Sequence, residues 1–249
     1  MIRRALEKVV EKYFASLQLP YQATLYDRLL LSLRKTDSVF TFNWDPFLCD
    51  AYERNRFDVP LPEIFFLHGN VRIGQCPEHP GLWRRIGHLC PECSGSLEKV
   101  PLLYPVKQKG YSGKPCISHS WQAAEFRFKN AFVITIFGFG APESDKDAVN
   151  LLKTSWLKGG NRKIEHIEII DTADPSLLYE RWKQFSPTLH LKICKEFNES
   201  WIAGWPRRSR EAVWIPSHYG EPCEDFPLMS TDILLDLQQE AIEIAGYEA

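Results

Sequence analysis

Two short segments of the chain carry metal-ligating side chains at matching positions. Cys-Pro-Glu-His occupies residues 76–79, and Cys-Pro-Glu-Cys occupies residues 90–93. A gap of two residues lets both side chains of one turn reach the same ion, and two such turns complete a tetrahedral set of ligands. Because all four positions are then filled, the metal is expected to be structural rather than catalytic. The predicted zinc (Zn²⁺) ligands are Cys76, His79, Cys90 and Cys93.

The remaining metal-ligating side chains fit a metal site less well. His88 is an alternative to His79, but its spacing from the cysteines is less suitable. The other cysteines are scattered along the chain and are expected to pack as small apolar residues. They are Cys49, Cys116, Cys194 and Cys223.

A second group of reactive side chains follows two apolar strands. Residues 38–42 predict a buried strand, and Asn43 and Asp45 come directly after it. Residues 64–67 predict another buried strand, which ends at His68. The polar residues after the first strand could simply cap the helix that follows. Alternatively they belong to a ligand site, because open parallel sheets bind ligands at the carboxyl ends of their strands.

The apolar pattern of the chain predicts the elements that position these groups. Helical spacing covers residues 2–17, 24–34, 46–56 and 231–245, the last capped by Thr231 or Asp232. Further strands are predicted at residues 131–137, 164–170 and 189–194, with a helix leading into the first of them. Apolar strands that alternate with helices indicate an α/β protein with a mainly parallel sheet and helices on both faces.

Composition and charge narrow the class of protein. The 249 residues are sufficient to bury a core, and a net charge of −2 gives no sign of direct nucleic-acid or membrane-surface binding. The basic run at residues 206–210 is expected to be a solvated loop, with a phosphate or partner contact as the alternative. The sequence has no apolar stretch of transmembrane length and no signal-peptide core, so a cytoplasmic protein is expected.

The order of these motifs resembles the sirtuin superfamily, and most closely its bacterial NAD-hydrolysing branch of defence proteins. Thr-Phe-Asn-Trp-Asp at residues 41–45 resembles the Thr-x-Asn-Tyr/Trp-Asp motif of that branch, and His68-Gly69 resembles its His-Gly motif. Residues 138–145 match most of its Gly-Tyr-Ser-x-Pro-x-x-Asp motif. The predicted metal ligands lie between the His-Gly motif and this third motif, where sirtuins have a zinc ribbon. The resemblance implies a Rossmann-like domain formed by residues 1–71 and 99–249, with an inserted zinc-binding module at residues 72–98.

The resemblance implies NAD⁺ as a substrate whose nicotinamide–ribose bond is hydrolysed, in a subunit acting in anti-phage defence. By this resemblance Asn43 positions the attacking water and the ribose, His68 is the base that acts on the ribose hydroxyls, and Asp45 holds the loop and contacts the ribose. The resemblance also implies a set of cofactor-binding residues. They are Thr41, Phe42, Gly138, Phe139, Gly140 and Asp145.

One expected element of this family does not occur in the sequence. Sirtuins begin with a strand and a Gly-Ala-Gly turn that cradles the pyrophosphate, but residues 1–68 contain no glycine. The strands that end at Asn43 and Gly138 would flank that strand, so either they pair directly or a strand from a second protein chain or homo-oligomer completes the sheet. The first predicted function is an NAD⁺ hydrolase. The alternative is a catalytically inert structural or sensing subunit of a complex, and the third candidate is an NAD-dependent protein deacylase.

Overall fold

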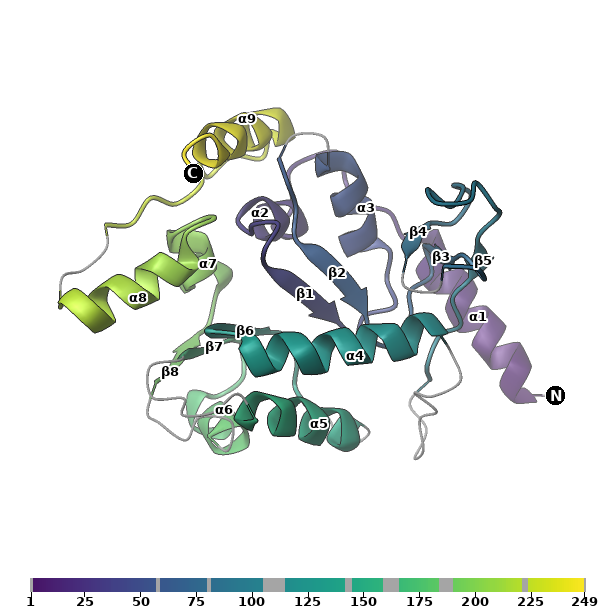
Figure 1. Ribbon diagram of the computed structural model, residues 1–249, viewed down its shortest axis with the longest axis horizontal. Coiled ribbons are helices and arrows are strands. Elements are labelled where there is room, and N and C mark those ends of the chain that lie inside the picture. The colour runs from purple at the N-terminus through teal and green to yellow at the C-terminus, as the bar shows by residue number, and fades with distance from the viewer. Residues whose placement is uncertain are drawn as a thin grey trace.

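The protein folds into two parallel β-sheets and one small antiparallel sheet, surrounded by helices (Figure 1). The computed structural model describes residues 2–56, 59–79, 82–104, 115–141, 145–158, 166–183, 190–220 and 224–248. The predicted α/β class with parallel strands is therefore confirmed.

The first parallel sheet contains two strands joined by one helix. Strand β1 (Ser38–Thr41) pairs with β2 (Glu63–Phe66), and helix α3 (Phe47–Asn55) connects them. The predicted strands at residues 38–42 and 64–67 both form, within one residue of their expected ends.

The second parallel sheet contains the remaining long strands in the order β6-β7-β8. Its elements are β6 (Val133–Phe137), α5 (Lys146–Leu157), β7 (His166–Ile170), α6 (Pro175–Trp182) and β8 (Leu191–Cys194). Helices α5 and α6 lie on one side of these strands in Figure 1. β7, the central strand, is almost wholly buried, as its apolar sequence predicts.

The two parallel sheets are separate, although a single sheet was expected. Within the described part of the chain, β1 has β2 as its only hydrogen-bonded neighbour, and β6 has only β7. Direct pairing of residues 38–42 with residues 132–137 therefore does not occur. Both sheets contribute to one apolar core, in which Ile64 of β2, Ile134 of β6 and Ile167 of β7 are buried together.

A buried polar cluster fixes the helices that support β1. Helix α2 (Leu25–Leu31) begins with a capping box, in which Thr24 and Asp27 satisfy each other's backbone N–H groups. Asp27 is fully buried and accepts hydrogen bonds from Arg54 and Asn55 of α3. Burial alone would raise the pKa of Asp27, but the hydrogen bonds from Arg54, Thr24 and Asn55 lower it below its usual value.

The antiparallel sheet carries the four predicted metal ligands. It consists of β3 (Ile73–Gln75), β4 (Trp83–Arg85) and β5 (Glu98–Lys99), with β3 in the centre. The indole N–H of Trp83 donates to the backbone carbonyl of Ile64 in β2 at 2.8 Å, and its ring packs edge-on against Phe66. This tryptophan therefore anchors the small sheet to the first parallel sheet.

The remaining helices lie around these sheets (Figure 1). They are α1 (Ile2–Ser16), α4 (Pro115–Asn130), α7 (Trp201–Gly204), α8 (Ser209–Tyr219), α9 (Leu234–Ala245) and the short 3-10 helix η2 (Phe197–Glu199). In the part of the chain described above, none of the helices has both the length and the apolar character needed to cross a membrane.

Two sequence predictions on the C-terminal side are wrong. The basic run is not a solvated loop throughout, because Arg207 is 1% exposed and its guanidinium donates to the carbonyls of Leu33 and Pro60 at 2.8 and 3.1 Å. Helix α9 begins at residue 234 without a side-chain cap. The hydroxyl of Thr231 instead accepts the N–H of Ile233 at 3.0 Å, which closes a turn before the helix.

Candidate functional site

The loops that follow β1 and β2 are joined by one buried asparagine. Asn70 is 2% exposed, and its side-chain N–H₂ donates to the backbone carbonyl of Asp45 at 2.5 Å and of Asn43 at 3.5 Å. The backbone N–H of Val71 donates to the carbonyl of Trp44 at 3.1 Å. These contacts hold together the two strand ends that carry the predicted polar residues.

A left-handed glycine positions His68 at the end of β2. Gly69 has φ +76°, and a Cβ atom there would lie 2.6 Å from the carbonyl oxygen of Pro101, so only glycine fits. The His68 carbonyl accepts the N–H of Leu103 at 2.9 Å. The backbone of His68 is therefore held by the turn at Gly69 and by the hydrogen bond from Leu103.

His68 lies beside a carboxylate from the second parallel sheet. Its Nε2 atom is 3.7 Å from Oδ1 of Asp145, the residue that precedes α5. Both side chains are buried, and the ring of Phe42 packs edge-on against the imidazole with centroids 4.8 Å apart.

The ends of β1 and β6 are brought together by aromatic stacking. The rings of Phe42 and Phe139 are stacked with centroids 4.4 Å apart. Gly138 ends β6 with φ +60°, and the space where its Cβ would lie is open. A ligand can therefore approach the backbone closely at Gly138.

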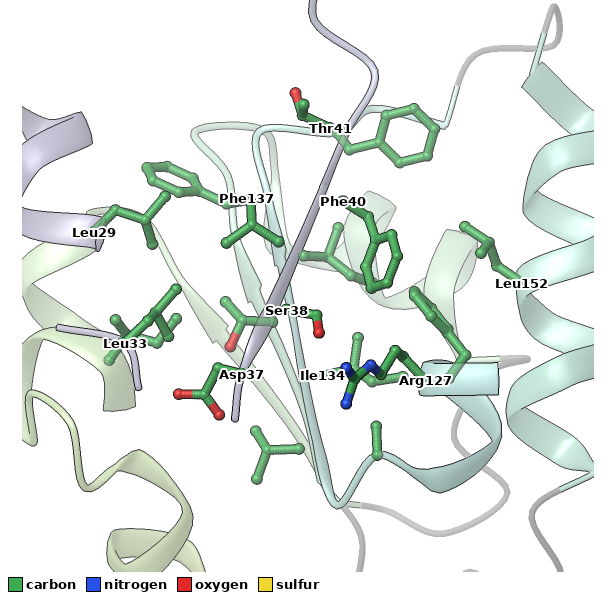
Figure 2. Close-up of a pocket in the computed structure, with 18 of the residues that line it drawn as sticks. Leu29, Leu33, Asp37, Ser38, Phe40, Thr41, Arg127, Ile134, Phe137 and Leu152 are labelled. Carbon is green, nitrogen blue, oxygen red and sulfur yellow. The ribbon is translucent and has the colours of Figure 1, made fainter. Parts of the chain in front are cut away.

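A cavity of about 900 Å³ lies between β1 and β6. Figure 2 shows residues of both strands around it, with Thr41 and Phe137 toward the upper end and Ser38 and Ile134 further down. Five predicted site residues line it, all at the carboxyl ends of these two strands. They are Thr41, Phe42, Asn43, Gly138 and Phe139.

The other predicted site residues do not line the cavity. His68 packs against Phe42, a wall of the cavity, and lies beside Asp145, and the Gly140 carbonyl accepts a hydrogen bond from Arg181 at 2.5 Å. Residues 142–144 of the third motif lie outside the described residues. Asn43 is exposed, and within the described residues its carboxamide makes no hydrogen bond, so it is available to a ligand.

Asp45 has a local structural role that the sequence left open. Its carboxylate accepts the N–H of Phe47 at 3.1 Å, at the first turn of α3. This hydrogen bond closes a turn that leads into α3, whose N-cap is Pro46 and which has no side-chain cap. Burial raises the pKa of Asp45, and the hydrogen bond from Phe47 opposes that shift.

The four predicted metal ligands converge on one point. The ligand atoms of Cys76, His79, Cys90 and Cys93 all lie within 4.8 Å of one another. The Cys76 sulfur is 3.6 Å from Nδ1 of His79 and 3.5 Å from the Cys93 sulfur. With bonds of about 2.3 Å to sulfur and about 2.0 Å to nitrogen, a tetrahedral ion separates its ligand atoms by about 3.5–3.8 Å. The cluster can therefore hold a metal ion such as zinc.

Backbone turns shape each half of this metal cluster. The N–H of His79 donates to the Cys76 carbonyl at 3.2 Å, and the N–H of Ser94 donates to the Cys90 carbonyl at 2.8 Å. A Cβ atom at Gly95 would lie 3.2 Å from the Cys93 sulfur, so a larger residue there would crowd a ligand. His88 is exposed and is not part of the cluster, which confirms the choice of His79.

Asn70 is the positioning residue that sequence reasoning did not assign. It directly follows the His-Gly pair, and that position was the only signal for it. Its partners are backbone carbonyls 25 and 27 residues away, which no local pattern reveals.

Comparisons with protein-family models, with curated proteins and with solved structures found no match.

Proposed function

We propose that the chain is a subunit that binds NAD⁺ at the carboxyl ends of β1, β2 and β6 and hydrolyses the bond between nicotinamide and ribose. The observation that carries this proposal is the buried His68–Asp145 pair, which lies against Phe42, a wall residue of the cavity that also contains Asn43. The strand ends of parallel sheets are the usual place for a dinucleotide.

The proposed reaction needs an oriented water and a base. The oxygen of water forms a bond to C1′ of the ribose, and the bond from C1′ to the nicotinamide nitrogen breaks with its electron pair leaving on that nitrogen. The water loses one proton, which His68 accepts by way of a ribose hydroxyl and passes to solvent. The products are nicotinamide, ADP-ribose and one proton.

Each side chain has a distinct role in this scheme. The exposed carboxamide of Asn43 orients the water, an effect of positioning. Asp145, at 3.7 Å, stabilises His68 while it carries the proton. An imidazole suits a base that works near neutral pH.

Support for a metal of structural type comes from the donor set. We propose that Cys76, His79, Cys90 and Cys93 bind zinc, because thiolate and imidazole ligands in a tetrahedral arrangement favour that ion. When bound, zinc would hold the antiparallel sheet together and leave no coordination position for a substrate.

The test follows nicotinamide release from NAD⁺ by the purified chain, alone and with candidate partner chains. His68→Ala and Asn43→Ala are each expected to reduce release by at least ~100-fold, a typical loss for a base or a positioning group. Asn130→Ala is the matched control, because Asn130 lines the same cavity but is the last residue of α4, before the amino end of β6. Equal losses in all three variants would contradict the proposed roles.

A second candidate function is a non-catalytic structural or sensing subunit, and the lack of any glycine in residues 1–68 to form a phosphate-binding turn favours it. No release of nicotinamide under any condition, together with partner binding, would support this function. Release that requires an acyl-lysine peptide would instead indicate a deacylase. Release to water alone supports the hydrolase, whose cellular effect would be NAD⁺ depletion during anti-phage defence.

A further inference from the structure

The cavity between β1 and β6 follows both strands along their whole length. Residues 37–43 line one side and residues 131–139 line the other. In Figure 2, Ser38 and Ile134 lie toward one end and Thr41 and Phe137 toward the other, so the two strands run in the same sense. The cavity therefore has the outline of a missing parallel strand.

The hydrogen bonds of the paired edges reveal which backbone groups of β1 face the cavity. The carbonyls of Asp37 and Thr41 accept N–H groups from the β2 side at 3.3 and 2.9 Å. Backbone direction alternates along a strand, so Val39 also faces β2, whereas the N–H and C=O groups of Ser38 and Phe40 point to the other side.

The same reasoning applies to β6. The carbonyl of Phe132 and the N–H of Gly138 bond to the β7 side at 3.1 and 2.9 Å. Alternation then directs the backbone groups of Val133, Thr135 and Phe137 away from β7 and toward the cavity. Within the described residues no bond is formed by these groups.

The walls of the cavity are mainly apolar, so they offer no polar partner to a backbone group that they shield from water. Leu29 and Leu33 of the α2 region cover one side, and Leu152 of α5 covers the other (Figure 2). Each buried N–H or C=O without a partner costs about 1–3 kcal/mol. The hydroxyl of Ser38 is also buried in the cavity without a hydrogen-bond partner among the described residues.

We propose that this cavity is a docking slot for one β-strand of a partner chain. A strand placed there would pair with β1 on one edge and with β6 on the other. It would give a continuous parallel sheet in the order β2-β1-partner-β6-β7-β8. Strands in a sheet lie about 4.8 Å apart, so β1 and β6 would lie about 9.6 Å apart with the docked strand between them. A helix cannot satisfy these edges, because its backbone groups already bond to one another.

The chemistry of the slot defines the partner segment. β1 has four residues and β6 has five, so the docked strand needs about as many. Apolar walls on both faces require a nearly continuous run of Val, Ile or Leu, as in a central parallel strand. In the described part of the chain every apolar strand already lies in its own sheet, so a second copy offers no spare strand of this kind. The proposal therefore commits to a different chain as the partner.

This inference goes beyond the proposed function and does not rest on NAD⁺ chemistry. A strand docked parallel to β1 and β6 would end beside Asn43 and Gly138, next to the candidate site. Strand binding without nicotinamide release would support the slot and contradict the hydrolase. Nicotinamide release without any strand binding would support the hydrolase and contradict the slot.

The test is a selection of displayed random eight-residue peptides on the purified chain. We expect enrichment of peptides with a central Val/Ile run, and expect the synthetic versions to slow amide exchange in residues 38–42 and 132–137 together. The control peptides carry proline at the centre of the run, which removes one N–H and blocks ladder pairing. They should bind at least ~10-fold more weakly.

Two protein variants locate the binding surface. Leu29→Arg places a charged, bulky group at a wall of the slot and should weaken peptide binding at least ~10-fold. Leu177→Arg is the matched control, because Leu177 is 63% exposed on α6 and does not line the cavity.

Four results would overturn the proposal. They are no enrichment above the proline controls, protection of only one of the two segments, equal effects of Leu29→Arg and Leu177→Arg, and protection of both segments by self-association of the chain.

Discussion

Arg207 offers the sharpest test of how the sheets are supported, because the sequence suggests a solvated residue and the structure buries it. Its side chain reaches the carbonyls of Leu33 and Pro60 and forms an ion pair with Glu248. Its own backbone N–H donates to the Ser32 carbonyl at 2.6 Å. Arg207 therefore ties the segment before α8 to the end of α2, directly before β1.

The expected cost of Arg207→Met follows from these contacts. The carbonyls of Leu31 and Leu33, which are buried, and of Pro60, which is an exposed residue, lose their donors. A buried acceptor left without a partner costs about 1–3 kcal/mol. Glu248 is 24% exposed and can turn to water, so its ion pair contributes less. The methionine side chain recovers part of the loss by remaining buried. We expect a net loss of about 3 kcal/mol, a large share of the roughly 5–15 kcal/mol stability of a domain.

Urea unfolding followed by tryptophan fluorescence measures this loss. With a slope of about 3 kcal/mol/M, the midpoint should fall by about 1 M. The matched control is Arg208→Met, since Arg208 is the exposed neighbour in the same basic run and should change stability by less than about 0.5 kcal/mol. Equal midpoints for the two variants would refute the structural role of Arg207.

Three further predictions concern other parts of the fold. Gly69→Ala should lower the free energy of unfolding by at least about 2 kcal/mol more than Gly87→Ala. Both glycines have positive φ, but only at Gly69 would an added Cβ atom clash with the backbone. Urea unfolding of both variants measures this difference. Asp27 stabilises the fold above its unfolded pKa of 3.8, and this stabilisation is lost as pH falls through its lowered folded pKa. The difference in unfolding free energy between wild type and Asp27→Asn should therefore shrink below about pH 4. A difference that stays constant with pH would be evidence against this role of Asp27. A chelator should lower the melting temperature of the wild type by about 5 °C or more, and should do the same to Cys116→Ser, because Cys116 is not a ligand of the cluster. The melting temperature of Cys93→Ser, which lacks one ligand, should not change with the chelator. Equal responses of the three proteins in calorimetry would count against the metal cluster.

Features with short sequence separation were predicted well. The metal ligands of each turn are only three residues apart, so their spacing alone identified the cluster that the structure brings together. The apolar strands at residues 38–42 and 131–137 were also recognised from local pattern, because each is a short, nearly continuous apolar run.

Features that depend on distant partners were not predictable in this way. Arg207 is buried by carbonyls 174 and 147 residues away, so its local basic sequence gives the wrong environment. Asn70 acts on a loop that precedes it by 25 residues or more. The start of helix α6, in contrast, is marked by a local signal, because Asp174 caps the helix and Pro175 is its first residue.

The open slot between β1 and β6 makes a residue-by-residue prediction for amide hydrogen exchange in the free protein. Phe40 and Thr135 direct their N–H groups toward the cavity, whereas Thr41 and Ile136 direct theirs toward β2 and β7. Exchange measured by NMR should therefore be at least ~100-fold faster at Phe40 and Thr135 than at Thr41 and Ile136. Equal protection of all four amides would mean that the two sheets are already joined in the free chain, and would contradict the slot.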